Sequence, residues 1–382
     1  MRVKTILPCL LICVLFASLL PSAALGEDFA AYAEPRFERR GVVGGAVIIS
    51  RNGEVLCSYA YGWANASRTR PVTLDTCFRI ASVTKLVTTI GLVKLMEENN
   101  LSYDTDISDI LGYTARNPAF PDTPITVRNV LTHTTGLVTG FSFHPTWDQL
   151  PVENRYFDPN VEAGTKYIYA NFNGGLMGAM IEALSGQSLN TYMTENVFEP
   201  LGINAAYHPG LLKDQSSVAN RMTNDGHTFA TADAEIATLP DYNDVCDPVN
   251  NTDISVGGLY ISANGMNRLI TMLQLGGTVD GIQILPEGTV EKMMACQVFE
   301  GSSVYVDAEY ALGLARVYKM PGGTWYGHQG RRDGLTSNMY FQPDTGLTVS
   351  VIANGYEAMS ENKVVTIARA FMEYAYEHFA KE

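Results

Sequence analysis

The chain has 382 residues, of which 46% are hydrophobic and 17% are charged. A chain of this length and composition can bury a sizeable apolar core, which excludes a miniprotein and a generally disordered protein. The formal net charge of -14 at pH 7 repels the phosphates of nucleic acids, so we expect no nucleic-acid partner.

The first 26 residues have the pattern of a secretory signal peptide. Arg2 and Lys4 form a short basic start, residues 6–20 are mostly apolar, and the segment Ala24-Leu25-Gly26 offers small residues at a cleavage site. A membrane anchor is the alternative, but the apolar run is shorter than the ~20 residues that a spanning helix needs. We therefore expect a secreted or periplasmic protein that has no membrane span once residues 1–26 are removed.

Both ends of the remaining chain predict the parts of one sheet. Residues 29–37 repeat apolar side chains at helical spacing, and the turn pair Asn52-Gly53 joins two predicted strands over residues 42–50 and 54–62. Near the C-terminus we expect three more strands and a final helix, over residues 310–318, 335–341, 347–353 and 364–379.

The middle of the chain has a different pattern. Its clearest segments are helical and lie between long loops rich in Pro, Asn, Asp and Gly, over residues 85–98, 173–184 and 266–275. We therefore predict an α/β (α+β) fold, in which an antiparallel sheet built from both termini is flanked by helices and carries a large, mainly helical insertion. The expected domain covers residues 27–382, with a sheet part at about 27–85 and 301–382 and a helical part at about 86–300.

The cysteines allow two interpretations. Four of them lie after the signal peptide, namely Cys57, Cys77, Cys246 and Cys296. In an oxidising compartment they could form two disulfides, and the short loops favour Cys57 with Cys77 and Cys246 with Cys296, but free buried thiols are nearly as compatible with the sequence.

Common cofactor and metal motifs are missing from the sequence. It has no Gly-x-Gly dinucleotide fingerprint, no Gly-Lys pair of a phosphate-binding loop, no Cys-x-x-Cys pair and no His-Glu-x-x-His zinc motif. The Gly-x-Ser-x-Gly elbow of another hydrolase class is missing as well. We therefore expect neither a cofactor nor a metal.

One segment has the residue types of an activated serine. Ser82-Val83-Thr84-Lys85 precedes a strongly apolar helix, so Ser82 and Lys85 lie three residues apart on one helical face and the amine can reach the hydroxyl. The same spacing recurs at Ser360 and Lys363, where we expect Ser360 to cap the terminal helix. Because a helix N-terminus stabilises negative charge, Ser82 is the better candidate for catalysis.

Two further motifs follow Ser82 in order. Tyr169-Ala170-Asn171 stands before a predicted helix, and His328-Gln329-Gly330 stands on a predicted strand near the C-terminus. With these three motifs the chain resembles the serine β-lactamase and penicillin-binding protein family, which includes class C β-lactamases, DD-peptidases and family VIII esterases. The segments around His133 and from Gly257 are similar to the family as well, so the resemblance covers nearly all of the chain after the signal peptide.

The resemblance implies a role for each of these residues. Ser82 would attack a carbonyl and form an acyl-enzyme, while Lys85 and Tyr169 would transfer its proton as a coupled pair in which either could be the base. Lysine and tyrosine titrate near pH ~10, so a base at neutral pH requires a pKa lowered by about three units. Asn171 would bind the substrate amide or position the Lys85 ammonium, and His328 would bind the substrate from the opposite wall.

The third motif departs from the family pattern. The N–H groups of Ser82 and Arg331 would form the oxyanion hole beside Gly330, but Gln329 replaces the usual Thr and Arg331 replaces a small residue. Recognition of a substrate carboxylate would then fall to Arg331 or Arg332. We expect His133 to be a structural residue.

The resemblance implies a small-molecule or peptide substrate. The favoured activity is that of a D-alanyl-D-alanine carboxypeptidase or a hydrolase of β-lactams and other D-peptides. A carboxylesterase of the same fold is the alternative within the family, because the same acylation chemistry serves all of these substrates. A non-catalytic module that binds peptidoglycan or penicillin is the alternative from another class.

Overall fold

A seven-stranded antiparallel sheet forms the centre of the molecule. The computed structural model describes residues 22–138, 156–223, 228–238, 244–247, 254–295, 308–332, 334–355, 360–361 and 364–380. The sheet has the strand order β10-β11-β12-β13-β14-β1-β2, so strands from the two ends of the chain meet where β14 pairs with β1. The strands are β1 (Gly44–Arg51), β2 (Glu54–Gly62), β10 (Ala308–Tyr310), β11 (Ala315–Met320), β12 (Gly323–Arg332), β13 (Leu335–Gln342) and β14 (Leu347–Asn354).

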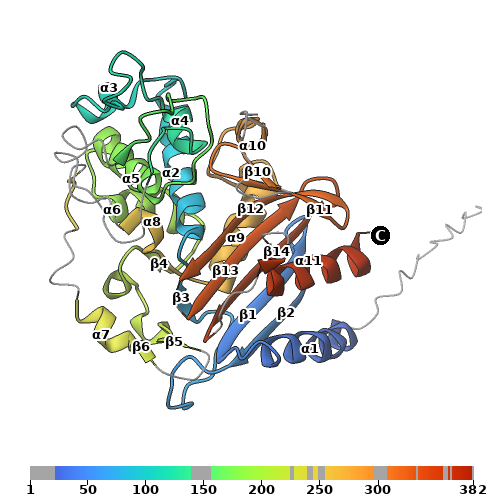
Figure 1. Ribbon diagram of the computed structural model, residues 1–382. Coiled ribbons are helices and arrows are strands. Elements are labelled where there is room, and N and C mark those ends of the chain that lie inside the picture. Colours follow the sequence, from blue (N-terminus) through green and yellow to red (C-terminus); the bar gives the residue numbers. More distant parts are fainter. Residues whose placement is uncertain are drawn as a thin grey trace, which may run out of the picture.

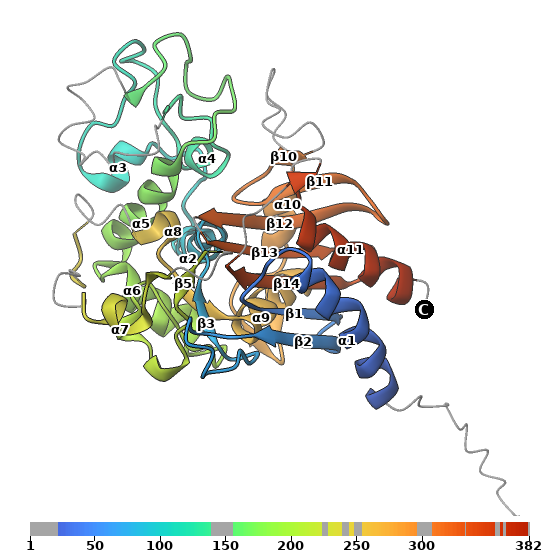
Figure 2. The same ribbon diagram turned by 60° about the horizontal axis from the view of Figure 1, so that its bottom comes forward.

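Helices cover both faces of this sheet. Helices α1 (Ser22–Glu38) and α11 (Thr366–Phe379) lie side by side on one face, and helix α9 (Ala263–Gln274) packs against β1, β13 and β14 on the other, as Figures 1 and 2 show. Along β1, Val47 and Ile49 join the cluster under α1 and α11, whereas Ala46 and Ile48 join the cluster toward α9. This alternation with a period of two explains why a strand of almost wholly buried residues forms here.

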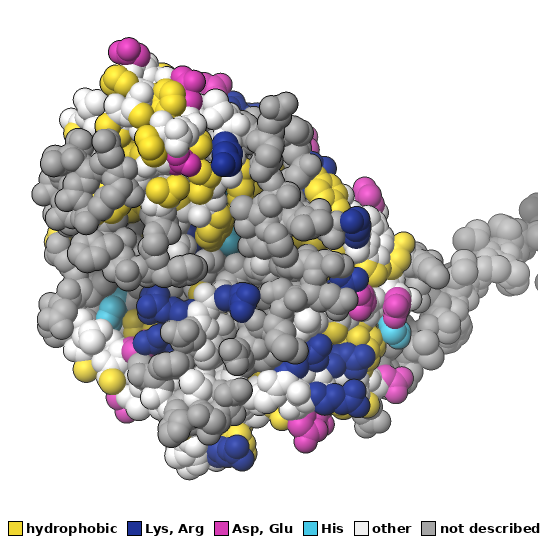
Figure 3. Space-filling view, viewed as in Figure 1, with side chains coloured by type: hydrophobic (Ala, Val, Ile, Leu, Met, Phe, Trp, Pro, Cys, Tyr) yellow, Lys and Arg dark blue, Asp and Glu magenta, His cyan; other side chains and the backbone are white. Residues whose placement is uncertain are grey.

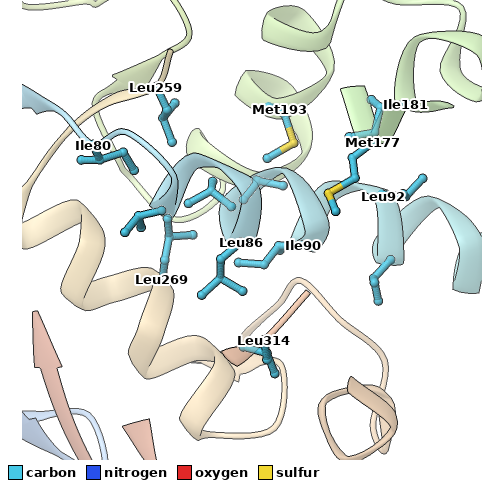
Figure 4. Close-up of a cluster of buried hydrophobic side chains, with 14 of the residues drawn as sticks. Ile80, Leu86, Ile90, Leu92, Met177, Ile181, Met193, Leu259, Leu269 and Leu314 are labelled. Atoms are coloured by element: carbon cyan, nitrogen blue, oxygen red, sulfur yellow. The ribbon is translucent and has the colours of Figure 1, made fainter. Parts of the chain in front are cut away.

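The helical region lies beside the sheet and is organised around helix α2 (Val83–Glu98). Its other helices are α3 (Ile107–Leu111), α4 (Val127–Leu131), α5 (Asn171–Ser185), α6 (Leu189–Met193), α7 (Ala232–Ile236), α8 (Ile254–Gly257) and α10 (Thr289–Met294). Nearly every side of α2 is buried, and Figure 4 shows Leu86 and Ile90 among apolar side chains from α5, α6, α9 and the loop before β11. The division of the chain into a sheet part and a helical part stays a prediction.

Short elements complete the described chain. A three-stranded sheet of order β3-β7-β4 leads into α2, and it consists of β3 (Cys77–Arg79), β7 (Tyr260–Ser262) and β4 (Ala205–Ala206). The remaining strands pair in twos: β5 (Arg221–Met222) with β6 (Thr228–Ala230), β8 (Thr278–Val279) with β9 (Ile282–Gln283), and β15 (Ser360–Glu361) with β16 (Val364–Val365). In the described part of the chain, no helix combines the length and the apolar character needed to cross a bilayer.

Two predictions about secondary structure are wrong. The strand expected over residues 310–318 is divided, because β10 ends at Tyr310 and the chain turns through Gly313, at φ +70°, before Ala315 pairs back with Tyr310. Ser360 does not cap the terminal helix, because it pairs with Val365 in a short hairpin before α11 begins. The helices and strands expected elsewhere are confirmed, with ends that differ by a few residues.

The favoured disulfide pairing of Cys57 with Cys77 is wrong. Both thiols are free, and they lie in separate apolar clusters, Cys57 under α1 and α11 and Cys77 beside β4 and β7. Burial raises the pKa of Cys57 to about 12 and that of Cys77 to about 11, as expected for inert core thiols. Cys246 is free and exposed, and Cys296 lies outside the described residues.

Candidate active site

Ser82 stands at a sharp passage from β3 into α2. The preceding residue, Ala81, has φ +45°, a left-handed conformation that is strained for a residue with a Cβ. Ser82 occupies the N-cap position, but its hydroxyl caps no backbone N–H of the helix. The Ser82 oxygen is therefore available for other partners at a helix N-terminus, where negative charge is stabilised.

Strand β12 runs directly against this passage. A Cβ added at Gly330 would lie 2.3 Å from the Ile80 carbonyl oxygen and 3.1 Å from the backbone nitrogen of Ser82. Ser337, on the neighbouring strand β13, donates a hydrogen bond to the same Ile80 oxygen. Glycine at position 330 thus allows the third sequence motif to touch the segment that carries the first.

Lys85 lies one helical turn after Ser82, and its amine is completely buried. Its Nζ lies 3.1 Å from Ser82 Oγ and 2.8 Å from the carbonyl oxygen of Val256 in α8. A Cβ at Gly174 would come within 3.1 Å of the Lys85 stem, so this glycine lets α5 pack closely on the lysine. Burial lowers the pKa of Lys85 to about 7, because a charged amine is disfavoured where water cannot solvate it.

Tyr169 faces the same amine from the segment before α5. The Lys85 Nζ lies 5.4 Å from the centre of the Tyr169 ring, and that ring lies 6.4 Å from the ring of His328. Asn171 is the first residue of α5, after an extended Ala170. The structure therefore brings together Ser82, Lys85, Tyr169 and His328 from three distant segments, as the three-motif hypothesis requires.

His328 is buried on β12 and is held in one tautomer. Its Nδ1 lies 2.7 Å from the Gln329 carbonyl oxygen, and its Nε2 lies 2.9 Å from the hydroxyl of Tyr310. Because a carbonyl only accepts, Nδ1 carries the proton, and Nε2 therefore accepts the hydrogen bond from Tyr310. Burial and then the charge of Lys85 lower the pKa of His328 to about 3, so this wall of the site is neutral at pH 7.

His133 lies on the other side of Tyr169 and is fully buried. Its ring stacks on the Tyr169 ring with 4.4 Å between centroids, and it meets Tyr310 edge to face at 4.8 Å. Its Nδ1 accepts hydrogen bonds from the backbone N–H of Ala170, at 3.2 Å, and from the side-chain amide of Asn173, at 3.0 Å. His133, for which we expect a structural role, is therefore in direct contact with Tyr169.

The remaining predicted residues lie around the outer end of β12. Arg331 and Arg332 are exposed, and Gln329 is half-buried. Arg331 follows Gly330 on β12, and the resemblance places its N–H in the oxyanion hole. Among the described residues, no three His, Cys, Asp or Glu side chains gather into a group that could hold a metal ion.

Sequence analysis missed several partners in the site. Tyr310 holds His328, the Val256 carbonyl holds Lys85, and Asn173 holds His133. The order of motifs identified His328 and Lys85, but no local signal marks Tyr310 or Val256, because both reach the site through tertiary packing. The Leu-Thr-His-Thr-Thr-Gly-Leu segment is the one signal that could have identified His133.

Known proteins share this arrangement of sequence and fold. Residues 29–371 match the Beta-lactamase family. Penicillin-binding protein 4 of Amycolatopsis lactamdurans is 25% identical over 84% of this chain and 82% of its own length. Esterase EstB of Burkholderia gladioli is 28% identical over 48% of this chain, which spans about half of EstB (52%).

A solved structure agrees with the sequence matches. The crystal structure of SurE with D-Leu superimposes with a TM-score of 0.65, covers 87% of this chain and 72% of the SurE chain, and is 26% identical in sequence. The α/β (α+β) fold expected from the sequence is confirmed, with a mixed arrangement of helices and an antiparallel sheet. Since the family match spans most of the chain, the protein belongs to the beta-lactamase family of serine hydrolases and penicillin-binding proteins.

Proposed function

We propose that the protein is an exported serine hydrolase that forms an acyl-enzyme on Ser82 and acts on D-alanyl-D-alanine peptides, as a carboxypeptidase, or on related D-peptides and β-lactams. One observation carries the acylation step. The Nζ of Lys85 lies 3.1 Å from Ser82 Oγ, and burial brings the pKa of that amine to about 7. A substantial fraction of the lysine is then neutral at physiological pH and can accept the serine proton.

The reaction follows from this contact. Ser82 Oγ attacks the substrate carbonyl carbon, and its proton passes to the Lys85 amine or to the Tyr169 phenolate, which act as a coupled pair. The N–H groups of Ser82 and Arg331 stabilise the oxyanion, and each such donor typically lowers the barrier by about 3 kcal/mol. The leaving amine takes the proton as its bond to carbon breaks, and water then cleaves the acyl-enzyme, which restores the hydroxyl of Ser82.

Two observations support a substrate with a carboxylate. The relatives include a penicillin-binding protein, and a crystal structure of SurE was determined with D-Leu. A cavity of about 460 Å³ is lined by Arg79, from strand β3, and by Arg221, whose charges together exceed that of Glu235, the ion-pair partner of Arg221. Arg79 donates to the Gly257 carbonyl, so the cavity is next to the segment that also binds Lys85. In Figure 3, Lys and Arg side chains lie near the centre of the face in view, although the chain is acidic overall.

A carboxylesterase is the second candidate, and the state of His328 favours it. Both ring nitrogens of His328 already have hydrogen-bond partners, and its low pKa keeps the ring neutral. The histidine of the third motif therefore offers no positive charge to a substrate carboxylate, and neutral esters need none. EstB, a relative over about half of this chain, is an esterase.

Turnover of three matched substrates separates these activities. We would assay a D-alanyl-D-alanine peptide, a penicillin and a short 4-nitrophenyl ester with the wild type and with Ser82→Ala. The proposal predicts release of D-alanine or hydrolysis of penicillin by the wild type only. Ester cleavage alone would select the second candidate, and binding of penicillin without turnover by either protein would identify a non-catalytic module.

Export remains part of the proposal. The basic start, apolar run and small residues of positions 1–26 support cleavage after Gly26. Expression of the full chain in a secreting host should yield a protein that begins at Glu27. Edman sequencing of the exported protein tests this, and an uncleaved N-terminus in the membrane fraction would contradict it.

A further inference from the structure

The reaction described above leaves one buried residue beside Tyr169 unused. His133 is fully buried, and it meets Tyr169 both through its ring and through the backbone on either side of that tyrosine. We propose that His133 is a positioning residue, which fixes the Tyr169 phenol for proton transfer by clamping the Tyr-Ala-Asn segment. This inference rests on the proposed role of Tyr169 in proton transfer.

The clamp begins with the backbone of His133. The residue has φ +55°, a left-handed conformation that few residues other than glycine adopt. In this conformation its carbonyl oxygen accepts the N–H of Ile168 at 2.8 Å, while its ring Nδ1 accepts the N–H of Ala170 at 3.2 Å. The N–H groups of the two residues on either side of Tyr169 thus both donate to His133, which restrains the backbone at Tyr169.

The ring of His133 fixes the side chain of Tyr169. The two rings stack with 4.4 Å between their centroids and 22° between their planes. Tyr310 meets His133 at 85°, with 4.8 Å between centroids, and so supports the stack from the edge. Rotation of the Tyr169 ring out of this plane would break the stack on His133.

A chain of hydrogen bonds selects the tautomer of His133. Thr135 Oγ1 accepts the N–H of Leu137 at 3.3 Å and donates to Asn173 Oδ1 at 3.0 Å. Asn173 therefore presents its NH₂ group to His133 Nδ1, which already accepts from Ala170, so Nδ1 bears no proton. The proton is on Nε2, which has no hydrogen-bond partner among the described residues.

The neutral form of the clamp has a chemical consequence. Burial, then the charges of Lys85 and His328, hold the pKa of His133 well below its usual range. An imidazolium at His133 would attract a phenolate at Tyr169 and repel the Lys85 ammonium. Because the His133 ring is neutral, Lys85 is the one cation that controls Tyr169 among the described groups that face His133. These groups are Lys85, His328, Tyr167, Tyr169 and Tyr310.

Two substitutions test the hydrogen bonds of His133 and its stacked ring separately. His133→Asn keeps an acceptor at the position of Nδ1 and tolerates positive φ, whereas His133→Phe keeps the stacked ring and leaves the donors of Ala170 and Asn173 without an acceptor. We expect His133→Asn to retain kcat within about tenfold and His133→Phe to lose about 100-fold with little change in KM, which corresponds to a misplaced catalytic group.

A double-mutant cycle distinguishes positioning from general support of the fold. If His133 acts through Tyr169, then His133→Phe should reduce kcat far less in a Tyr169→Phe background, because the phenol that it positions is already absent. An equal loss in both backgrounds, or equal kcat for the wild type, His133→Asn and His133→Phe, would overturn the proposal.

Hydrogen exchange gives a readout that needs no turnover. The clamp predicts that the amides of Ile168 and Ala170 exchange at least tenfold faster in His133→Phe than in the wild type or in His133→Asn. Unchanged exchange would overturn the clamp. If the proposed function itself fails, the wild type and Ser82→Ala will have the same activity, and exchange will still decide whether His133 holds this segment.

Discussion

Two buried histidines lie on either side of Tyr169, and they carry their protons on opposite ring nitrogens. His328 donates from Nδ1 to the Gln329 carbonyl and accepts at Nε2 from Tyr310. His133 accepts twice at Nδ1, from Ala170 and Asn173, and keeps its proton on Nε2. The partners that the fold supplies determine the tautomer, although the residue type, the burial and the neutral charge are the same.

The comparison also separates two kinds of support for the site. His328 lies on the rigid sheet, on the strand that touches the Ser82 segment at Gly330. His133 lies in a strained turn and holds the segment around Tyr169 through the N–H groups of Ile168 and Ala170. Burial and then the charge of Lys85 lower the pKa of both histidines, so both rings sense the same amine.

Removal of that amine should have the largest effect. Lys85→Met eliminates the proton acceptor beside Ser82, and we expect kcat/KM to fall at least about 1,000-fold. Because a lysine with a folded pKa of about 7 in place of 10.5 costs about 5 kcal/mol when it is protonated, the free energy of unfolding below pH 7 should rise by a few kcal/mol. Urea unfolding and ester kinetics check both results, and an active or less stable variant would contradict them.

The pH profile tests whether both histidines stay neutral. Lys85 must lose a proton to act as a base, so kcat/KM should rise with pH through about 7 and be about 100-fold lower at pH 5 than on the plateau. Burial, then the charge of Lys85, lowers the pKa of His328 to about 3 and holds that of His133 well below its usual range, so we expect neither to add an ionisation near that of Lys85. A second ionisation between pH 4 and 7 that disappears in His133→Asn or His328→Asn would show that one histidine titrates there.

Displacement of strand β12 should reduce kcat/KM less than the loss of Lys85. In Gly330→Ala the new Cβ would collide with the Ile80 carbonyl, so β12 must move away from Ser82. We expect kcat/KM to fall about tenfold to 100-fold, since a shift near 1 Å of catalytic groups has effects of this size. Kinetics combined with circular dichroism measure this loss in a folded protein, and wild-type kinetics would exclude a close approach of β12 to Ser82.

Loss of the partner of His328 should have a smaller effect. Tyr310→Phe keeps the ring that meets His133 but leaves Nε2 of His328 without the hydroxyl donor, so kcat/KM should fall about tenfold. Tyr103→Phe is a matched control, because its hydroxyl bonds to Glu97 near the far end of α2. Equal kinetics for the two variants would mean that the tautomer of His328 has no effect on the reaction.

The smallest effect concerns stability in acid. The pKa of His328 is about 3 when folded and near 6.5 when unfolded, so unfolding takes up a proton between these values and stability falls as the pH falls from 6.5 toward 3. His328→Asn should reduce this slope by up to about 1.4 kcal/mol per pH unit. Urea unfolding at pH 4, 5 and 6 measures the slope, and an unchanged slope would show that His328 is already charged in the folded protein.

The sequence predicted the residues of the site better than their contacts. Ser82 and Lys85 follow from helical spacing, and Tyr169 and His328 follow from the order of motifs. The contacts of Tyr310 and Val256 depend on how distant segments pack, which no spacing encodes. The segment around His133 resembles the family but predicts only a structural residue, because the contacts of its ring and backbone with the segment around Tyr169 arise from tertiary packing.

Two features of the fold likewise depend on tertiary packing that the local sequence does not predict. Apolar runs joined by short turns predicted β1, β2, β13 and β14, because these strands pair with their neighbours in sequence. The turn at Gly313 divides an equally apolar segment, since its backbone amide bonds to the Leu131 carbonyl in the helical region. Cys57 and Cys77 are close in the sequence but belong to different cores, which loop length alone does not reveal.

Mass spectrometry of the acylated protein tests the central claim most directly. Incubation with a penicillin or with an activated ester, followed by acid quench and peptide mapping, should place one acyl group on the peptide that contains Ser82, and Ser82→Ala should remain unmodified. An acyl group on another residue, or equal labelling of both proteins, would contradict acyl-enzyme formation on Ser82.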